Sequence, residues 1–172
     1  GVVFSNGGWD IVVKNNIVVN PISHTGVVSA LYYTWAAPQA KEFFDEGGLI
    51  RKRLEKEVNY KSPPYSTKYP ILQSYLNVIT AGKEWQGMRA QGNLLADNVI
   101  VGGPENPIHL MGGQYAQMDG KNNFVTKEDP GFVDIKNGNF NLKADSKVYK
   151  EIPGFQKIPF DKIGIYKDQY RK

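Results

Sequence analysis

The 172-residue chain contains no cysteine. This absence excludes a disulfide framework, a thiol nucleophile and a metal site built on cysteine thiolates. A chain without cysteine fits a bacterial protein that is secreted, periplasmic or held at the cell surface, and we expect one of these locations.

The sequence also lacks a long apolar run. A helix needs about 20 apolar residues to span a bilayer, so we expect no transmembrane segment. No secretory signal peptide is visible, and the chain begins at Gly1-Val2-Val3-Phe4, within an expected strand. We interpret this start as a processing boundary and expect the chain to be part of a longer protein.

A strong charge of one sign is missing as well. Lys and Arg number 21 against 17 Asp and Glu, which gives a net charge of +4. The two signs are interleaved, as in Arg51-Lys52-Arg53-Leu54-Glu55-Lys56-Glu57. This pattern is typical of a solvated surface, and no RNA-recognition, zinc-finger or helix-turn-helix motif is present. We therefore expect no nucleic-acid partner.

What the chain does contain is a repeated motif, in which paired polar residues precede a short apolar strand. It occurs at Asn15-Asn16-Ile17-Val18-Val19, at Asp97-Asn98-Val99-Ile100-Val101 and at Asn122-Asn123-Phe124-Val125-Thr126. Asn98 follows Asn16 by 82 residues, and Asn123 follows Asn98 by 25. A period of about 25 residues lies in the range of solenoid repeats.

The repeat predicts an all-β fold, a right-handed parallel β-helix in which short strands stack from coil to coil. Strands this short bury their faces only against neighbours above and below. Equivalent asparagines would then hydrogen-bond in a ladder through the stack. The alternative is that the Asn pairs form ordinary tight turns between unrelated hairpins.

Two segments depart from the strand pattern within the single domain that we expect over residues 1–172. A helical insertion is predicted at about 38–80, because Pro38 suits a first helical turn and Leu49, Ile50, Leu54 and Val58 recur at helical spacing. Residues of about 145–172 are proline-broken and apolar, and we expect them to form an extended C-terminal cap, because solenoid ends need covering.

Several motifs together resemble one known group of proteins. They are Asn6-Gly7-Gly8 before the first Asn pair, Ser62-Pro63-Pro64-Tyr65-Ser66-Thr67-Lys68-Tyr69-Pro70, Asp129-Pro130-Gly131-Phe132-Val133-Asp134 with Asn139-Phe140, and Ile158-Pro159-Phe160-Asp161-Lys162-Ile163-Gly164-Ile165-Tyr166. With them the chain resembles the C-terminal portion of right-handed parallel β-helix proteins of the pectin-lyase-like superfamily, found among secreted bacterial proteins. The resemblance covers nearly the whole chain.

The resemblance implies a polysaccharide or oligosaccharide partner and further coils upstream, on which this chain would pack. It implies either a glycoside hydrolase or a polysaccharide lyase; the alternative is a non-catalytic β-helix that binds carbohydrate or builds a cell surface. Similar sequences often carry a His-x-Asp-x-Arg-like segment, and this chain departs from it, since Thr25, Gly26 and Val27 follow His24.

Asp10 and His24 are the candidate catalytic residues. Glycoside hydrolysis uses two carboxylates, whereas elimination on a uronate uses a base and a cation. Asp10 is the first carboxylate candidate because Trp9 beside it would stack on a sugar ring, and His24 has a suitable acid–base chemistry. The alternatives are that Asp10 orders a turn, that Trp9 packs in the core and that His24 is structural.

The insertion supplies the remaining candidates, because long excursions from a rigid scaffold commonly build binding faces. The predicted substrate-binding residues are Trp9, Arg51, Arg53, Glu55 and Tyr65, with arginine suited to a uronate or a sulfate. The alternative is an amphipathic helix whose charges lie in water. No cofactor and no metal ion are predicted.

Overall fold

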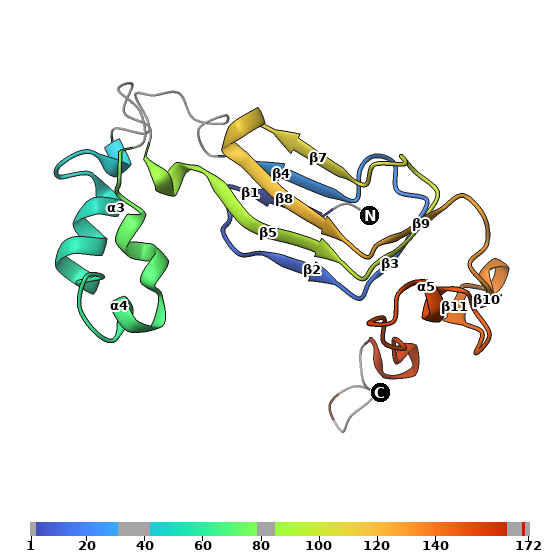
Figure 1. Cartoon of the computed structure of the whole chain (residues 1–172). Helices are drawn as coiled ribbons and strands as arrows, with labels where there is room; N and C mark the ends of the chain where they lie inside the picture. The colour runs from blue at the N-terminus through green and yellow to red at the C-terminus, as the bar shows by residue number, and fades with distance from the viewer. Residues whose placement is uncertain (1–2, 31–41, 79–84, 165–169, 171–172) are drawn as a thin grey trace.

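The computed structural model describes residues 3–30, 42–78, 85–164 and 170 of the chain (Figure 1). Nine short strands lie in three parallel sheets of three strands each. Sheet A has the order β1-β4-β7, sheet B the order β2-β5-β8 and sheet C the order β3-β6-β9. The strands are β1 (Val3–Asn6), β2 (Val12–Lys14), β3 (Ile17–Val19), β4 (Gly26–Ser29), β5 (Ala90–Ala96), β6 (Val99–Val101), β7 (Ile108–Met111), β8 (Ala116–Lys121) and β9 (Phe124–Thr126).

The predicted fold class, an all-β right-handed parallel β-helix, is wrong. The described residues combine three separate parallel sheets with helices in a mixed α/β arrangement, and no solenoid is seen among them. The Asn repeat specifies only turns and short strands. It does not specify how the three sheets combine with the helical segment between β4 and β5.

The predicted ladder of asparagine side chains is confirmed. The backbone N–H of Asn16 donates to Asn98 Oδ1 at 3.0 Å, and the N–H of Asn98 donates to Asn123 Oδ1 at 3.1 Å. The side-chain amides of Asn16 and Asn98 donate to the same two oxygens, at 3.0 and 2.9 Å. The ladder holds β3, β6 and β9 in parallel register, with Ile17 opposite Val99 and Val99 opposite Phe124.

The residue before each ladder asparagine has a left-handed backbone. The φ angles are 58° at Asn15, 51° at Asp97 and 51° at Asn122. Asn and Asp tolerate this region better than other residues that carry a Cβ. The paired polar residues of the repeat therefore have different roles, because the first makes the turn and the second makes the ladder.

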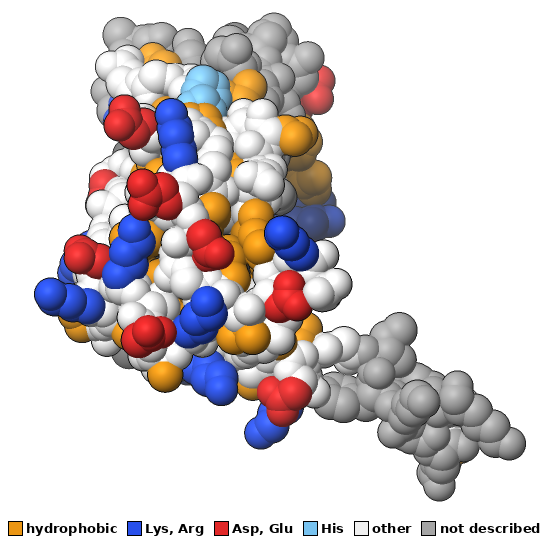
Figure 2. All heavy atoms as spheres, turned by 90° about the vertical axis from the view of Figure 1, so that its right-hand side faces the viewer, with side chains coloured by type: hydrophobic (Ala, Val, Ile, Leu, Met, Phe, Trp, Pro, Cys, Tyr) orange, Lys and Arg blue, Asp and Glu red, His pale blue; other side chains and the backbone are white. Residues whose placement is uncertain are grey.

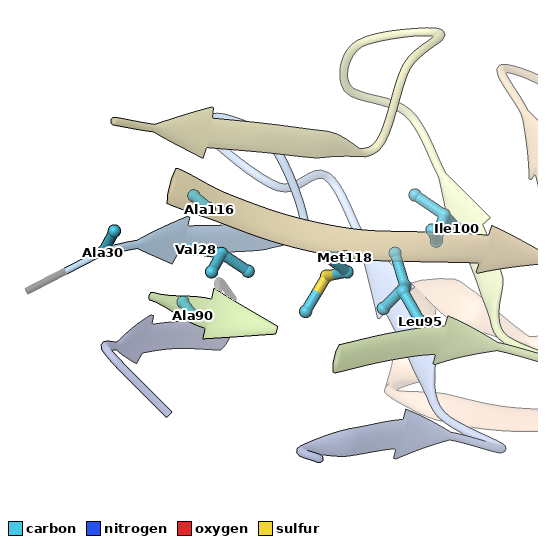
Figure 3. Close-up of a cluster of buried hydrophobic side chains, with 7 residues drawn as sticks. All are labelled: Val28, Ala30, Ala90, Leu95, Ile100, Ala116 and Met118. Atoms are coloured by element: carbon cyan, nitrogen blue, oxygen red, sulfur yellow. The ribbon is translucent and has the colours of Figure 1, made fainter. Parts of the chain in front are cut away.

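A core of apolar side chains lies between the sheets (Figure 3). Figure 3 shows them projecting from strands of all three sheets into one shared interior: Val28, Ala30, Ala90, Leu95, Ile100, Ala116 and Met118.

The segment that follows β9 packs on sheet C. Strands β10 (Phe132–Asp134) and β11 (Asn139–Leu142) form an antiparallel pair around η5 (Ile135–Asn137), and α5 (Val148–Glu151) and η6 (Phe160–Lys162) follow. Val99 and Val101 share a buried cluster with residues of this segment, namely Phe132, Leu142, Val148, Ile152 and Phe155. The described part of the expected extended cap thus contains helical turns and lies along sheet C (Figure 1).

Asp129 closes the turn that opens this C-terminal segment. Its Oδ1 accepts from the backbone N–H groups of Gly131 and Phe132, both at 2.8 Å. These two hydrogen bonds stabilise the carboxylate and hold the pKa of Asp129 below its ordinary value.

Acid is therefore expected to weaken the wild-type protein partly through Asp129. A lowered pKa contributes stability that is present above the ordinary aspartate pKa and is lost as the pH falls through the folded value, below about pH 4. Urea unfolding at neutral pH and at low pH should show a smaller acid-induced loss for Asp129→Asn than for the wild type. Asp145→Asn, an exposed aspartate outside this turn, is the control. An acid-induced loss in Asp129→Asn equal to that of the wild type would contradict the prediction.

The helical segment between β4 and β5 has its own buried cluster. The segment contains α3 (Leu49–Lys52), the π-helical η1 (Arg53–Val58), α4 (Tyr65–Lys68), η2 (Pro70–Ser74) and η3 (Gln86–Met88). A further short helix, η4 (Gly113–Tyr115), lies between β7 and β8. The cluster contains Phe44, Tyr60, Leu76, Trp85 and Met88. Figure 1 shows α3 and α4 at the end of the sheets opposite β10 and β11.

Residues 38–41, 79 and 80 of the predicted insertion lie outside the described residues. In the part of the chain that the structure describes, every helix is too short or too polar to cross a bilayer.

Candidate functional site

A cleft of about 250 Å³ opens between the turn that joins β1 to β2 and the helical turn η2. One wall comes from the first strands and the other from the insertion, so residues far apart in sequence meet there. The lining residues are Gly7, Trp9, Asp10, Tyr69, Ile71, Leu72 and Tyr75.

Asn93, a buried residue of β5, holds the β1–β2 turn in place. Its Oδ1 accepts from the backbone N–H of Ile11 at 3.0 Å, and its Nδ2 donates to the carbonyl of Gly8 at 3.1 Å. Nδ2 also donates to the carbonyl of Gln117 in β8 at 3.1 Å. One amide with 1% of its surface exposed thus joins the turn to two strands of sheet B.

Trp9 and Tyr75 form an aromatic corner of the cleft. Their ring centroids lie 5.1 Å apart with an angle of 53° between the planes. The indole N–H of Trp9 donates to the backbone carbonyl of Arg89, which fixes the ring against the strand side. Burial raises the pKa of the Tyr75 phenol above its ordinary value.

Tyr75 is held from behind by two further contacts. Its ring lies against the backbone of Gly87, where a Cβ atom would collide with ring carbons. Its centroid lies 5.8 Å from that of Phe44 in the insertion core. Tyr69 forms the opposite, open side of the cleft, with 54% of its surface exposed.

Asp10 lies at the rim and is exposed. Its φ of 55° is left-handed, and its backbone N–H donates to the carbonyl of Gln91 at 3.0 Å. Gly92 lies directly beside its carboxylate, because a Cβ at Gly92 would meet Asp10 Oδ1. Asp10 is the one carboxylate among the described residues that line the cleft.

The structure does not bring His24 to Asp10. Gly26 pairs with Val3 and Ser29 pairs with Asn6, so His24 precedes the start of sheet A whereas Asp10 follows its end. The intervening strand alone spans about 10 Å. The two predicted catalytic residues therefore lie at opposite ends of a sheet.

His24 has a different partner, His109 of β7. Their ring centroids lie 4.9 Å apart, with 26° between the ring planes. Figure 2 shows histidine at the surface of a face on which acidic and basic side chains are intermixed. The described residues of that face form no continuous basic patch of the kind that binds nucleic acid.

Three of the predicted binding residues lie outside the cleft. Arg51 donates from Nε to the carbonyl of Phe44 at 2.8 Å, which joins α3 to the segment before it. Arg53 and Glu55 are exposed on η1 and are not lining residues.

The other two candidates from the same prediction, Trp9 and Tyr65, are aromatic. Trp9 lines the cleft. Tyr65 does not line it; its ring lies 6.5 Å from that of the lining residue Tyr69, with 33° between the planes. Sequence reasoning missed Tyr69 and Tyr75, because the sequence of the insertion does not say which part of the scaffold these residues face.

Among the described residues, no group of three or more His, Asp or Glu side chains is placed to hold a metal ion. Comparisons of the chain with known protein families, with curated proteins and with solved structures find no match. The resemblance to the pectin-lyase-like superfamily therefore stays a prediction.

Proposed function

We propose that this chain binds carbohydrate in the cleft between the β1–β2 turn and η2. The observation that carries the proposal is the combination of an open aromatic corner, Trp9 with Tyr75, and a carboxylate at its rim. A sugar ring has an apolar C–H face, which stacks on aromatic rings, and an edge of hydroxyl groups, which donate to a carboxylate. Few other ligands present both chemistries on one small ring.

The cleft supports binding better than cleavage. Glycoside hydrolysis needs a second carboxylate within about 10 Å of the first. The described lining offers Asp10 alone, and His24 lies beyond the other end of sheet A. Asp10 and His24 are the expected contributors of this chain to a hydrolase or lyase, and they do not meet in the cleft, so we favour the non-catalytic alternative.

The volume of about 250 Å³ is below the usual range for sites that enclose a drug-sized ligand. A shallow cleft of this size fits one ring of a longer glycan that continues across the surface. We accordingly propose a polysaccharide or oligosaccharide as the partner, and a secreted, periplasmic or cell-surface location in which such chains are met.

Removing the exposed wall of the cleft should weaken glycan binding. We expect Tyr69→Ala to weaken it about tenfold, which corresponds to about 1.4 kcal/mol, since an aromatic face and its buried area are lost. Affinity electrophoresis through a panel of polysaccharides would identify a ligand, and calorimetry would measure the dissociation constant.

Tyr170→Ala is the matched control, because Tyr170 is an exposed tyrosine, 85% accessible, that does not line the cleft. The proposal is wrong if no glycan of the panel binds, or if Tyr170→Ala weakens binding as much as Tyr69→Ala. The same panel can be assayed for new reducing ends and for ultraviolet-absorbing unsaturated products, which would reveal a hydrolase or a lyase.

A further inference from the structure

The charges around the cleft select among sugars. Asp10 is the only ionised side chain among the described lining residues, and the remainder of the lining is glycine, aliphatic or aromatic. Building on the proposed function, we propose that the cleft prefers a sugar unit with a protonated amino group, accepts a neutral unit less well and rejects a uronate.

The carboxylate of Asp10 acts on a charged sugar electrostatically. A protonated amine near the Asp10 carboxylate is attracted, whereas the carboxylate of a uronate is repelled by it. Because Asp10 is exposed, water and salt screen both effects, and the attraction is modest.

The aromatic rings of the lining also favour a cationic sugar over an anionic one. Trp9, Tyr69 and Tyr75 present π-faces or ring edges to the same space. A π-face is negative, so an ammonium group within about 6 Å gains a cation–π attraction, most strongly on tryptophan. An anion over the same face gains nothing, and the aromatic lining therefore reinforces the preference set by Asp10.

The arginines that would recognise a uronate, Arg51 and Arg53, are not lining residues of the cleft. Arg51 donates to the Phe44 carbonyl, inside the insertion. Arg53 is on η1 and does not line the cleft. A bound carboxylate thus meets no cationic side chain among the described lining residues, and the uronate specificity considered from the sequence does not fit this geometry.

A matched set of ligands tests the preference. Tetramers of β-1,4-linked glucosamine and glucose differ only in the group at C2, and a uronate oligomer of equal length adds the negative charge. At mildly acidic pH and low salt, we expect the wild type to bind the glucosamine tetramer about tenfold more tightly than the glucose tetramer, a difference of about 1.4 kcal/mol. The uronate oligomer should bind most weakly.

Asp10→Asn removes the charge and keeps the turn, because asparagine already occupies the same left-handed conformation at Asn15 and Asn20. In this variant the advantage of glucosamine should fall to about threefold or less, as only the cation–π attraction remains. Asp97→Asn is the matched control, since Asp97 has a φ of 51° in another turn and is not a lining residue. It should keep the full advantage.

The outcomes separate the two proposals. If the tetramers bind with equal affinity, or if Asp97→Asn reduces the glucosamine advantage as much as Asp10→Asn, the charge preference is wrong while carbohydrate binding stands. Tighter binding of the uronate oligomer would also overturn the preference alone. If neither these ligands nor any polysaccharide of the panel binds, the proposed function is wrong, and the preference falls with it.

Discussion

Replacing Asn98 with alanine is expected to destabilise the protein by about 3 kcal/mol, at the upper end of the usual range for single substitutions. Asn98 is fully buried in the middle of the asparagine ladder. The two N–H bonds of its Nδ2 are shared among three acceptors, the carbonyls of Val13 and Ala96 at 3.0 and 2.8 Å and Asn123 Oδ1 at 2.9 Å, and its Oδ1 accepts from the backbone of Asn16.

The size of this effect follows from the partners that the substitution leaves behind. Alanine removes both the donor and the acceptor of the side chain, so the carbonyls of the buried Ala96 and the half-buried Val13 and the N–H of the exposed Asn16 lose these hydrogen bonds together. Each unsatisfied buried group costs about 1–3 kcal/mol. Small domains have only about 5–15 kcal/mol of total stability, so the variant should be close to unfolding.

Urea unfolding followed by circular dichroism measures the loss. Asn122→Gly is the control: Asn122 is exposed, has the left-handed backbone that glycine adopts freely, and makes one long side-chain hydrogen bond of 3.4 Å. We expect it to cost less than about 1 kcal/mol. Asn98→Asp should be as damaging as alanine, because a carboxylate cannot donate to the two carbonyls. A loss below about 1 kcal/mol for Asn98→Ala would show that the ladder does not stabilise the sheets as described.

The ladder is also where sequence reasoning succeeds. Each residue of the paired polar motif has a physical role that can be read from its type. The first residue adopts a left-handed φ in the turn. The side chain of the second forms hydrogen bonds with the equivalent asparagine of a neighbouring strand. The spacing of 25 residues between Asn98 and Asn123 is the separation of two hydrogen-bonded residues. Local chemistry that recurs in this way can be predicted from the chain alone.

The fold class could not be predicted by the same reasoning. The repeat describes a few residues around each turn, whereas the class also depends on the chain between β4 and β5, whose helices pack on each other through Phe44, Tyr60 and Trp85. That cluster depends on contacts between distant segments, which periodicity does not reveal.

The candidate site shows the same division. Trp9 and Asp10 could be identified because turn chemistry and residue type coincide at one point of the sequence. Tyr69 and Tyr75 could not, because they reach the cleft only through the placement of η2 beside the first strands. His24 and Asp10 are predicted to act together only because both side chains suit acid–base catalysis. The parallel pairing of β1 with β4 places them beyond opposite ends of these strands.

Gly87→Ala is expected to abolish glycan binding and to destabilise the protein by about 2 kcal/mol. Gly87 is buried in η3, and its backbone N–H donates to the carbonyl of Tyr75 at 2.8 Å. A Cβ at this position would collide with carbon atoms of the Tyr75 ring. The Tyr75 ring also contacts Trp9, so a displacement of the ring would disturb the Trp9–Tyr75 pair that forms the corner of the cleft.

Two further variants isolate the cause. Gly138→Ala places a methyl group where no atom lies within 4 Å, although φ is 76°; it should cost about 1 kcal/mol in stability and leave the affinity for glycan unchanged. In a Tyr75→Ala background the collision is absent, so Gly87→Ala should cost less than about 0.5 kcal/mol there. The coupling of the two positions, measured by urea unfolding, therefore reports the contact directly. Wild-type binding by Gly87→Ala, or equal costs in both backgrounds, would place the Tyr75 ring elsewhere and remove one wall of the proposed cleft.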